Sequence, residues 1–278
     1  GDTAVSDKQR THFFLEARDR GAELVVIDIA YRTMAGKADW FIPVHPATDG
    51  ALALGAVHEI FDQGWEDTEF LRKCTEAPFL VKDDGKFLRM SEMGVAPTTT
   101  TNAQGQEVTV DPQVVWDEDT QTAMPYGKAT KPALGNVPDI NGVHVRTELE
   151  MIRESVEPWT VEHASEVTGT SVEDIKRLAR MYTQEGNVLT DTKYGLNHYN
   201  NGMYSSKCVD VLLLVSGQIG APGRGLYTGE PNFGEGNIQA AIMMPSATGQ
   251  VPPGVGAKLN WTDFCGIVQT GKKMGQDF

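Results

Sequence analysis

Short apolar runs alternate with amphipathic stretches along the first part of the chain. Leu24 to Ile27 form an apolar run that ends at Asp28, a pattern typical of a buried strand in a parallel sheet. A second strand is predicted over 40–44, and apolar residues at helical spacing predict helices over 8–20 and 51–61. In the first helix we expect three side chains to face inward: Phe13, Phe14 and Ala17. This order of elements predicts half of a doubly wound α/β sheet.

An acidic residue follows each of these two strands. Asp28 stands at the carboxyl end of the first strand, where open α/β sheets bind their ligands. Asp49 follows the second strand and the turn over 46–48. Carboxylates there can accept hydrogen bonds from ribose hydroxyls or from the amino edge of a purine. We expect both acids to face one crevice that holds a nucleotide. In the alternative, Asp28 is a turn residue and Asp49 only caps a helix.

Residues 62–140 change in character. Asp-Gly turns, threonine runs and scattered prolines predict extended structure at the surface, with a hairpin turn at 83–85. We interpret this segment as an excursion inserted into the α/β domain. The acids at 117–119 are interpreted as a solvated loop and not as a metal site.

The later part of the chain returns to regular elements. Thr160 and Ser171 are predicted to cap two helices, and a strand begins at Val188. It leads into a stretch of small and hydrogen-bonding residues over 194–202, followed by an apolar helix over 208–218.

A second Gly- and Asn-rich stretch covers 232–239. Small and amide-bearing residues let backbone and side chains approach a polar ligand closely, so 194–202 and 232–239 are expected to form two walls of one polar cleft. His198 is either a ligand contact there or a hydrogen-bonded structural histidine.

Composition narrows the function classes. The chain has 278 residues, 40% of them hydrophobic, and a formal net charge of −14, which argues against nucleic acid or an anionic membrane as partner. Backbone amides at a helix start could still bind phosphate. No apolar run approaches the ~18 residues of a membrane span, so direct membrane insertion is not expected. Three separated cysteines, Cys74, Cys208 and Cys265, form neither a metal motif nor a disulfide framework. Because the chain starts at Gly1 without Met, we expect a piece of a longer polypeptide.

The motifs of the first part resemble those of a known family. The order Val-Val-Ile-Asp28, Arg32-Thr33, Ala38-Asp39 and Pro46-Ala-Thr48-Asp49-Gly-Ala-Leu resembles the molybdopterin oxidoreductase family of the dimethyl-sulfoxide-reductase type. Ile29 replaces a proline of the family motif and Ala47 a glycine. The resemblance implies that Asp28 and Asp49 contact the guanosine of a molybdopterin guanine dinucleotide. It places Arg32 and Thr48 in the same cofactor-binding motif, and Gly1 and Asp2 in a loop near the cofactor's phosphates.

The resemblance continues through the two polar stretches. Gly195, Asn197 and His198 match a loop that lies against a pterin in the family, and Asn237 and Gln239 match a loop near the metal–pterin end. Phe233 stands where formate-dehydrogenase-like members have an active-site arginine, which speaks against formate chemistry.

The resemblance also implies cofactors and partners. The full-length enzyme would hold two guanine dinucleotides and molybdenum or tungsten. The metal's protein ligand and the cysteines of an iron–sulfur cluster would lie upstream of Gly1, so we predict no metal ligand and no catalytic residue in this piece. Its partners would be an iron–sulfur electron-transfer subunit, together with the rest of the catalytic subunit. The enzyme would be cytoplasmic or exported by the twin-arginine route.

We therefore predict an α/β fold, Rossmann-like and doubly wound with a mostly parallel sheet, carrying an irregular extended insertion. Residues 1–225 would form the cofactor-binding domain with its excursion at 62–140, and 226–278 would begin a following cofactor-binding segment. The piece would be inactive alone.

Two alternative functions remain. A nicotinamide-dependent Rossmann dehydrogenase fragment would need a Gly-x-Gly-x-x-Gly turn, and none precedes Asp28. The other alternative is a non-enzymatic interaction module with a degenerate nucleotide fold. Cofactor retention in the full-length parent would separate the cofactor-binding function from this alternative.

Overall fold

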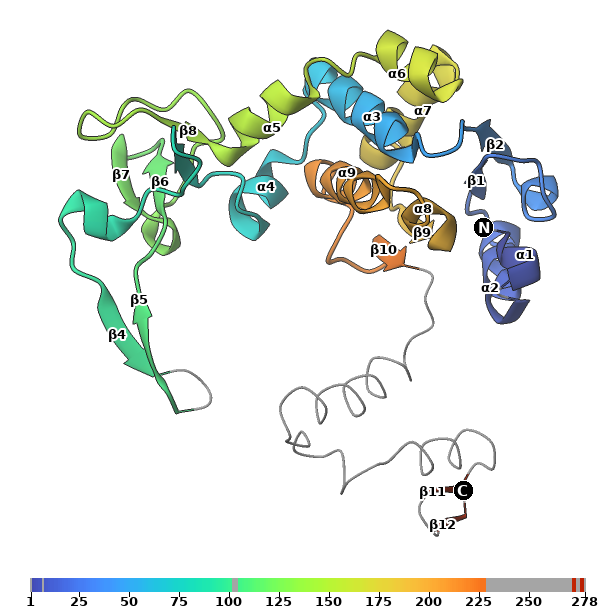
Figure 1. The fold of residues 1–278 in the computed structure, drawn as a ribbon, viewed down its shortest axis with the longest axis horizontal. Helices are drawn as coiled ribbons and strands as arrows, with labels where there is room; N and C mark the ends of the chain where they lie inside the picture. The colour runs from blue at the N-terminus through green and yellow to red at the C-terminus, as the bar shows by residue number, and fades with distance from the viewer. Residues whose placement is uncertain (1, 7, 102–104, 229–271, 274–275, 278) are drawn as a thin grey trace. The chain divides into compact units, whose positions relative to one another are not determined.

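The structure is a computed structural model that describes residues 2–6, 8–101, 105–228, 272–273 and 276–277 (Figure 1). The chain forms two compact units, Gly1–Thr228 and Gly229–Phe278. In the second unit the described residues form one short antiparallel pair, β11 (Lys272–Lys273) with β12 (Gln276–Asp277). All other elements belong to the first unit. No helix among the described residues has both the length and the apolar character needed to cross a membrane.

Two pairs of parallel strands belong to the α/β part of the first unit. Strand β1 (Val25–Asp28) pairs with β2 (Trp40–Pro43), and β9 (Leu189–Thr192) pairs with β10 (Gly225–Thr228). Within the described residues these remain separate two-stranded sheets. The fold is therefore mixed α/β with small sheets, and the single doubly wound sheet stays a prediction.

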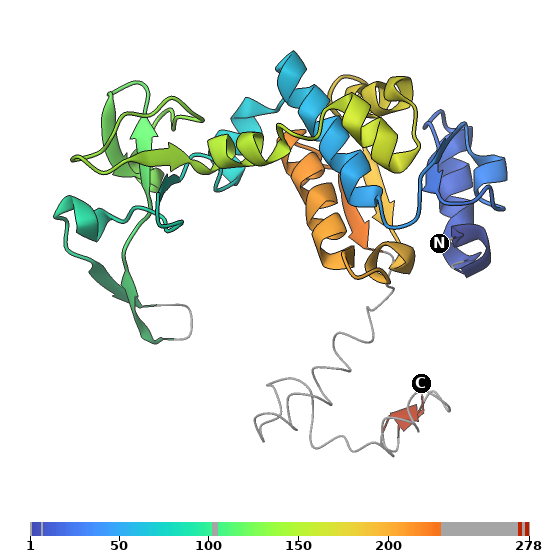
Figure 2. The same ribbon diagram turned by 45° about the horizontal axis from the view of Figure 1, so that its top comes forward.

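Helix α3 (Asp49–Gln63) is the centre of the main core. It packs against α5 (Glu148–Val156), α6 (Val161–Thr168), α7 (Val172–Thr183) and α9 (Gly202–Val215). Figures 1 and 2 show α3 between α9 and the α6–α7 pair. Fully buried aliphatic side chains fill the contact: Ile42, Val57, Ile60, Ile175 and Leu213.

Local capping explains where these helices begin and end. The side chain of Thr160 accepts a hydrogen bond from the amide of His163, and that of Ser171 from the amide of Asp174. Both caps are as predicted from the sequence. Helix α3 ends at Gly64, whose φ of 65° is the left-handed conformation that favours glycine at a helix end.

Small residues let the helices approach α3 closely. A Cβ added at Gly55 would lie 2.4 Å from the Cβ of Ala164 in α6 and 3.4 Å from Ile175 in α7. A Cβ added at Gly50 would lie 3.1 Å from the Cα of Ser205 in α9. The glycines lower the helix propensity of α3, and the close packing compensates for this loss.

The N-terminal helices differ in part from the prediction. Helix α1 (Thr3–Ser6) precedes α2 (Lys8–Asp19), in which Phe13 is 60% exposed, so the expected inward position of Phe13 is wrong. The helix instead contacts the β9–β10 pair through Arg10. Its guanidinium bonds Asp191 at 2.6 Å and lies 3.8 Å from the ring centroid of Tyr227. The guanidinium of Arg10 therefore makes the inward contact that the apolar pattern predicted for the ring of Phe13.

The excursion is extended, as predicted, and has a small core of its own. Its antiparallel pairs are β3 (Leu80–Lys82) with β8 (Val145–Thr147), β4 (Thr98–Thr101) with β5 (Glu107–Val110), and β6 (Val114–Asp117) with β7 (Thr122–Pro125). Helix α4 (Thr68–Cys74) leads into it. Short 3-10 helices cover Met90–Met93 and Tyr126–Lys128, and another, Ala35–Lys37, precedes β2. Buried aliphatic side chains form this core: Leu80, Leu88, Val114, Ile140 and Val145.

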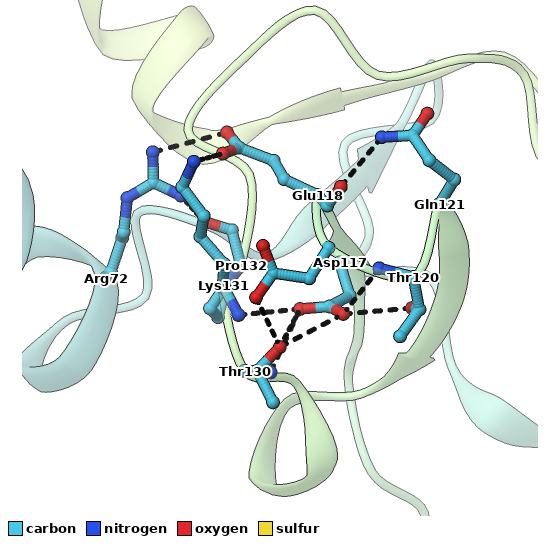
Figure 3. Close-up of polar contacts among 9 residues, drawn as sticks. Arg72, Asp117, Glu118, Thr120, Gln121, Thr130, Lys131 and Pro132 are labelled. Atoms are coloured by element: carbon cyan, nitrogen blue, oxygen red, sulfur yellow. Dashed lines mark hydrogen bonds and ion pairs between the residues drawn. The ribbon is translucent and has the colours of Figure 1, made fainter.

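Asp117 organises the turn after β6 (Figure 3). Its buried carboxylate accepts hydrogen bonds from the amides of Lys131 at 2.6 Å, Thr130 at 2.9 Å and Thr120 at 3.1 Å. These bonds, that of Lys131 foremost, hold the pKa of Asp117 below its ordinary value. The interpretation of 117–119 as a solvated loop is therefore wrong for Asp117. Its side chain accepts hydrogen bonds from backbone amides in place of backbone carbonyls. No group of three or more His, Cys, Asp or Glu side chains suited to a metal occurs in the described part of the chain.

The packing of α3 yields a stability prediction. Gly55→Ala gains about 1 kcal/mol of helix propensity, but overpacking a core costs about 1–3 kcal/mol. The clashing neighbour is a Cβ fixed to the α6 backbone, which cannot rotate away, so we expect net destabilisation of about 1–2 kcal/mol by urea unfolding.

The double variant Gly55→Ala/Ala164→Gly is the matched control. It moves one methyl group from α6 to α3, removes the clash and should recover most of the lost stability. Equal destabilisation in the single and double variants would show that the two helices do not meet at this point.

Candidate nucleotide-binding site

The structure brings the two predicted acids to the same end of the β1–β2 pair. Asp28 is the last residue of β1 and lies opposite Pro43 in the parallel register, and Asp49 is the first residue of α3 after the turn that follows β2. Burial raises the pKa of Asp49 above its ordinary value, and the charge of Asp28 raises it further. Both acids therefore lie at the carboxyl edge of one parallel pair, the edge at which open α/β sheets bind their ligands.

Arg32 lies beside Asp28. Its Nε is 3.8 Å from Asp28 Oδ1, which also accepts the amide of Ala30 at 3.3 Å. The Arg32 side chain is 50% exposed, so this ion pair contributes little to stability. Arg32 therefore remains available to a ligand at little energetic cost.

Asp2 holds the loop that carries Arg32. One oxygen of its carboxylate accepts the amide of Thr33 at 3.0 Å, and the other accepts the amides of Met34 and Ala4, each at 3.1 Å. Because both oxygens are engaged, Asp2 positions this loop in the structure. Gly1 lies outside the described residues.

The turn before α3 is anchored to the link between α6 and α7. The His45 amide donates to the carbonyl of Thr168 at 2.8 Å, and Gly169 leaves room for the imidazole, since an added Cβ would lie 2.5 Å from its Nε2. The Thr48 hydroxyl donates to the carbonyl of His45 at 2.8 Å. Ala47 has a φ of 66°, a conformation that favours glycine, the residue of the family motif at this place. The turn that presents Asp49 is thus held by hydrogen bonds on both sides.

The predicted second loop meets this turn. Asn201 donates its side-chain amide to the carbonyl of Ala47 at 2.8 Å. The segment before it forms a helical turn, α8 (Tyr194–Asn197), so Gly195 and Asn197 lie in α8 and the exposed His198 follows it.

Helix α9 begins at Gly202, before the predicted start at Cys208. Its buried Ser205 packs at the start of α3, and this tertiary contact favours helix where the sequence pattern favours loop. Asn237 and Gln239 lie outside the described residues, so the two-walled cleft stays a prediction.

A charged cluster that the sequence motifs did not predict lies beside β9. Lys193 follows this strand directly, and its Nζ lies 3.6 Å from Asp191, which also pairs with Arg10. The three side chains are between 10% and 18% exposed. Arg10 and Lys193 therefore share one acid at this strand end. Asp191 and Lys193, two residues apart in the sequence, were the available signal, but the contact from Arg10 depends on the fold.

The chain is similar in sequence to several curated proteins. No protein-family model matches the chain. It is 29% identical, over 80% of its length, to the catalytic subunit of a putative dimethyl sulfoxide reductase of Halobacterium salinarum. It is 27% identical over 78% to the alpha subunit of the respiratory nitrate reductase of Haloferax mediterranei, and 28% identical over 75% to a subunit of the sulfite dehydrogenase of Allochromatium vinosum. These matches cover 24–25% of each relative, so the chain spans about a quarter of their length.

A solved structure shows a weaker likeness. Acetylene hydratase from Pelobacter acetylenicus superposes with a TM-score of 0.46 at 16% identity, covering 76% of this chain and 19% of that one. This likeness is too weak to assign the fold. The curated relatives confirm the resemblance inferred from the sequence motifs: the chain is similar to the catalytic subunits of molybdopterin oxidoreductases of the dimethyl-sulfoxide-reductase type.

Proposed function

We propose that this chain is the guanine-dinucleotide-binding portion of the catalytic subunit of a molybdenum or tungsten oxidoreductase. The observation that carries the proposal is the pair of acids at the carboxyl end of β1–β2, with Asp49 half-buried at the start of α3. The curated relatives are named reductases and dehydrogenases, which supports the reaction class. Because the chain spans only about a quarter of their length, the activity belongs to a longer protein.

The chemistry of the two acids fits a guanine base. The edge of guanine presents ring and amino N–H donors, and an ionised carboxylate is an acceptor only. Burial disfavours the charged form of Asp49, and the neighbouring Asp28 adds repulsion. A donor-rich ligand would relieve both costs by forming charge-assisted hydrogen bonds. Asp28 and Asp49 would thus hold the guanosine, with Arg32 and Thr48 at its margin.

The remaining site residues would meet the other parts of the cofactor. Gly195, Asn197 and His198 would contact a pterin, and Asn237 and Gln239 its metal-bearing end. Gly1 and Asp2 would lie near the phosphates, where the bonds from Asp2 keep the Arg32 loop in place. When bound, the metal–pterin group supplies the redox chemistry, and this chain binds and orients it.

The exposed apolar residues support a larger sheet. Parallel sheets are normally covered on both faces, yet Ile27 in β1 is 40% exposed and Ile29 just after it 46%. We propose that the two parallel pairs belong to one doubly wound, Rossmann-like sheet of the whole protein, within a domain over 1–225. Residues 226–278 would begin the next cofactor-binding segment.

The proposal extends to the partners. Several relatives are named as one subunit of an enzyme, and in four of them it is the alpha subunit, which supports an enzyme of several chains. One partner would be an iron–sulfur electron-transfer subunit. The metal ligand and a cluster would lie in the rest of the catalytic subunit.

Asp49→Asn should raise stability and weaken cofactor binding. Burial raises the pKa of Asp49, so its ionised form is disfavoured in the folded state, and the wild type loses stability as pH rises through this carboxyl's titration. In the ligand-free chain, Asp49→Asn should therefore have the higher denaturation midpoint at pH 7, and the difference should vanish in acid.

In the full-length enzyme the same change should weaken cofactor retention roughly ten- to a hundredfold, because hydrogen bonds to a charged group contribute about 1.5–3 kcal/mol. Asp62→Asn is the matched control, since its side chain, at the far end of α3, is 64% exposed. Unchanged cofactor retention in the Asp49→Asn enzyme would show that Asp49 does not contact the guanosine.

His198→Ala should act on turnover. If His198 contacts the pterin, its loss should lower the turnover of the full-length enzyme roughly tenfold or more while cofactor content stays unchanged, since one hydrogen bond in a network is worth about 1–3 kcal/mol. Steady-state kinetics and cofactor analysis of one preparation separate the two effects. Unchanged turnover in the His198→Ala enzyme would show that His198 does not contact the pterin.

The purified chain alone should contain neither molybdenum nor pterin. It spans about a quarter of its relatives and would supply only part of the contacts to each dinucleotide. Elemental analysis and pterin fluorescence measure this directly. Near-stoichiometric metal would mean that a metal ligand lies within this chain.

A further inference from the structure

The β4–β5 hairpin is an arm whose base is fixed and whose strands contribute to no core. At the base, the Asp111 carboxylate accepts the amide of Ser91 at 3.0 Å and the hydroxyl of Ser91 at 2.6 Å. The amide of Met90 donates to the carbonyl of Pro112 at 3.0 Å. None of the eight strand residues belongs to a hydrophobic cluster of the described residues. Figures 1 and 2 show the hairpin extending away from β3, β6 and β7, so the excursion holds this arm without covering it.

The strand pairing sorts the side chains of the arm onto two faces. Val110 lies opposite Thr98 in the antiparallel register, and paired residues share a face. Val108 lies opposite Thr100, and because side chains alternate along a strand, these two residues share that same face. The other four side chains, three threonines and Glu107, lie on the opposite, polar face. We call the first set the valine face, and its two valines are 36% and 38% exposed.

The arm has few of the features that protect a ribbon left in solvent. An isolated two-stranded hairpin is only marginally stable in water, and its free edges can pair with other strands. Lysine and proline protect many such edges, but the strands of the arm contain neither and carry one charged residue, Glu107. Seven of the eight strand residues are β-branched, a composition that suits a strand packed on another surface. These features indicate an arm that is covered in the assembled protein.

We propose that the valine face packs against an apolar surface of the same polypeptide that lies outside residues 1–278. A stable interface between separate proteins buries about 800 Å² on each partner, from about 20–30 residues. The valine face offers four small side chains, which is too little to hold a separate chain. A covalently linked surface needs far less area, because the linkage gives it a high effective concentration.

The relatives provide the polypeptide that such a surface requires. Each match covers 24–25% of the relative, so about three quarters of the relative's length lies outside it. This choice of occupant rests on the proposed function, since it requires the chain to be a portion of a longer catalytic subunit. The valine face carries no charge, and a charged group buried against it would be unpaired. The contacting surface is therefore apolar and uncharged.

Hydrogen exchange of the amides over 95–113, measured by mass spectrometry, tests this contact. These amides should exchange at least about tenfold more slowly in the full-length catalytic subunit than in the chain of residues 1–278, because packing suppresses local opening. Val108→Lys should abolish the difference, since it places a charge in the buried contact. Thr109→Lys is the matched control, because it adds the same charge to the next residue of the same strand on the polar face, and it should keep the difference.

A second variant covers the case in which Val108→Lys unfolds the hairpin itself. Val108→Thr keeps the β-branched shape and adds only a hydroxyl, so it should reduce the protection in the full-length subunit and leave exchange in the chain of residues 1–278 unchanged. Equal exchange in the two unmodified proteins, or equal losses of protection in Val108→Lys and Thr109→Lys, would overturn the contact.

The same measurement distinguishes the other occupants. Protection that appears only after a partner subunit is added would assign the valine face to that subunit and overturn the contact within one polypeptide. Protection in the chain of residues 1–278 that rises with its concentration, together with dimers in sedimentation, would assign it to a second copy and overturn the contact as well. Cofactor retention in Asp49→Asn tests the proposed function separately, so failure of the dinucleotide site and failure of this contact give different results.

Discussion

The close packing around α3 determines the arrangement of the first unit. Helices α6 and α7 approach at Gly55, and α9 approaches at Gly50, one residue after Asp49. Each fully buried aliphatic side chain in this contact contributes about 1.5–3 kcal/mol, but only while the helices remain at this distance. The position of Asp49 is therefore fixed by the same contact that forms the core. A larger side chain at either glycine would move the candidate site along with the helix.

The polar residues near the site divide into those that hold the loops and those left for a ligand. His45, Thr48, Asn201 and Asp2 use their groups to bond backbone amides or carbonyls. Asp49 does the opposite, because it bears the cost of burial beside another acid. Strongly perturbed carboxylates cluster at functional sites, and this contrast with its structural neighbours supports the proposed role of Asp49.

The sequence predicted features that depend on local chemistry. The strands that lead to the two acids, the caps at Thr160 and Ser171 and the extended excursion all follow from residues close together in the chain. The exposure of Phe13, the early start of α9 and the pairing of Arg10 with Asp191 did not, because each depends on a partner far away in sequence. Asp117 is the clearest case: three adjacent acids suggest solvent, yet the first accepts amides from residues 130 and 131.

Asp117 and Glu148 show how two acids of neighbouring segments acquire opposite roles. Asp117 is surrounded by amide donors, so hydrogen bonds lower its pKa and a bound cation would have to displace bonds already formed. Burial raises the pKa of Glu148, whose Oε2 has no hydrogen-bond donor among the described residues, and the charge of Glu76 raises it further. Asp117 is the more deeply buried of the two, so burial alone would raise its pKa, and the amide donors reverse that effect. The hydrogen-bond donors around each carboxylate, and not the local number of acidic residues, therefore separate the lowered pKa of Asp117 from the raised pKa of Glu148.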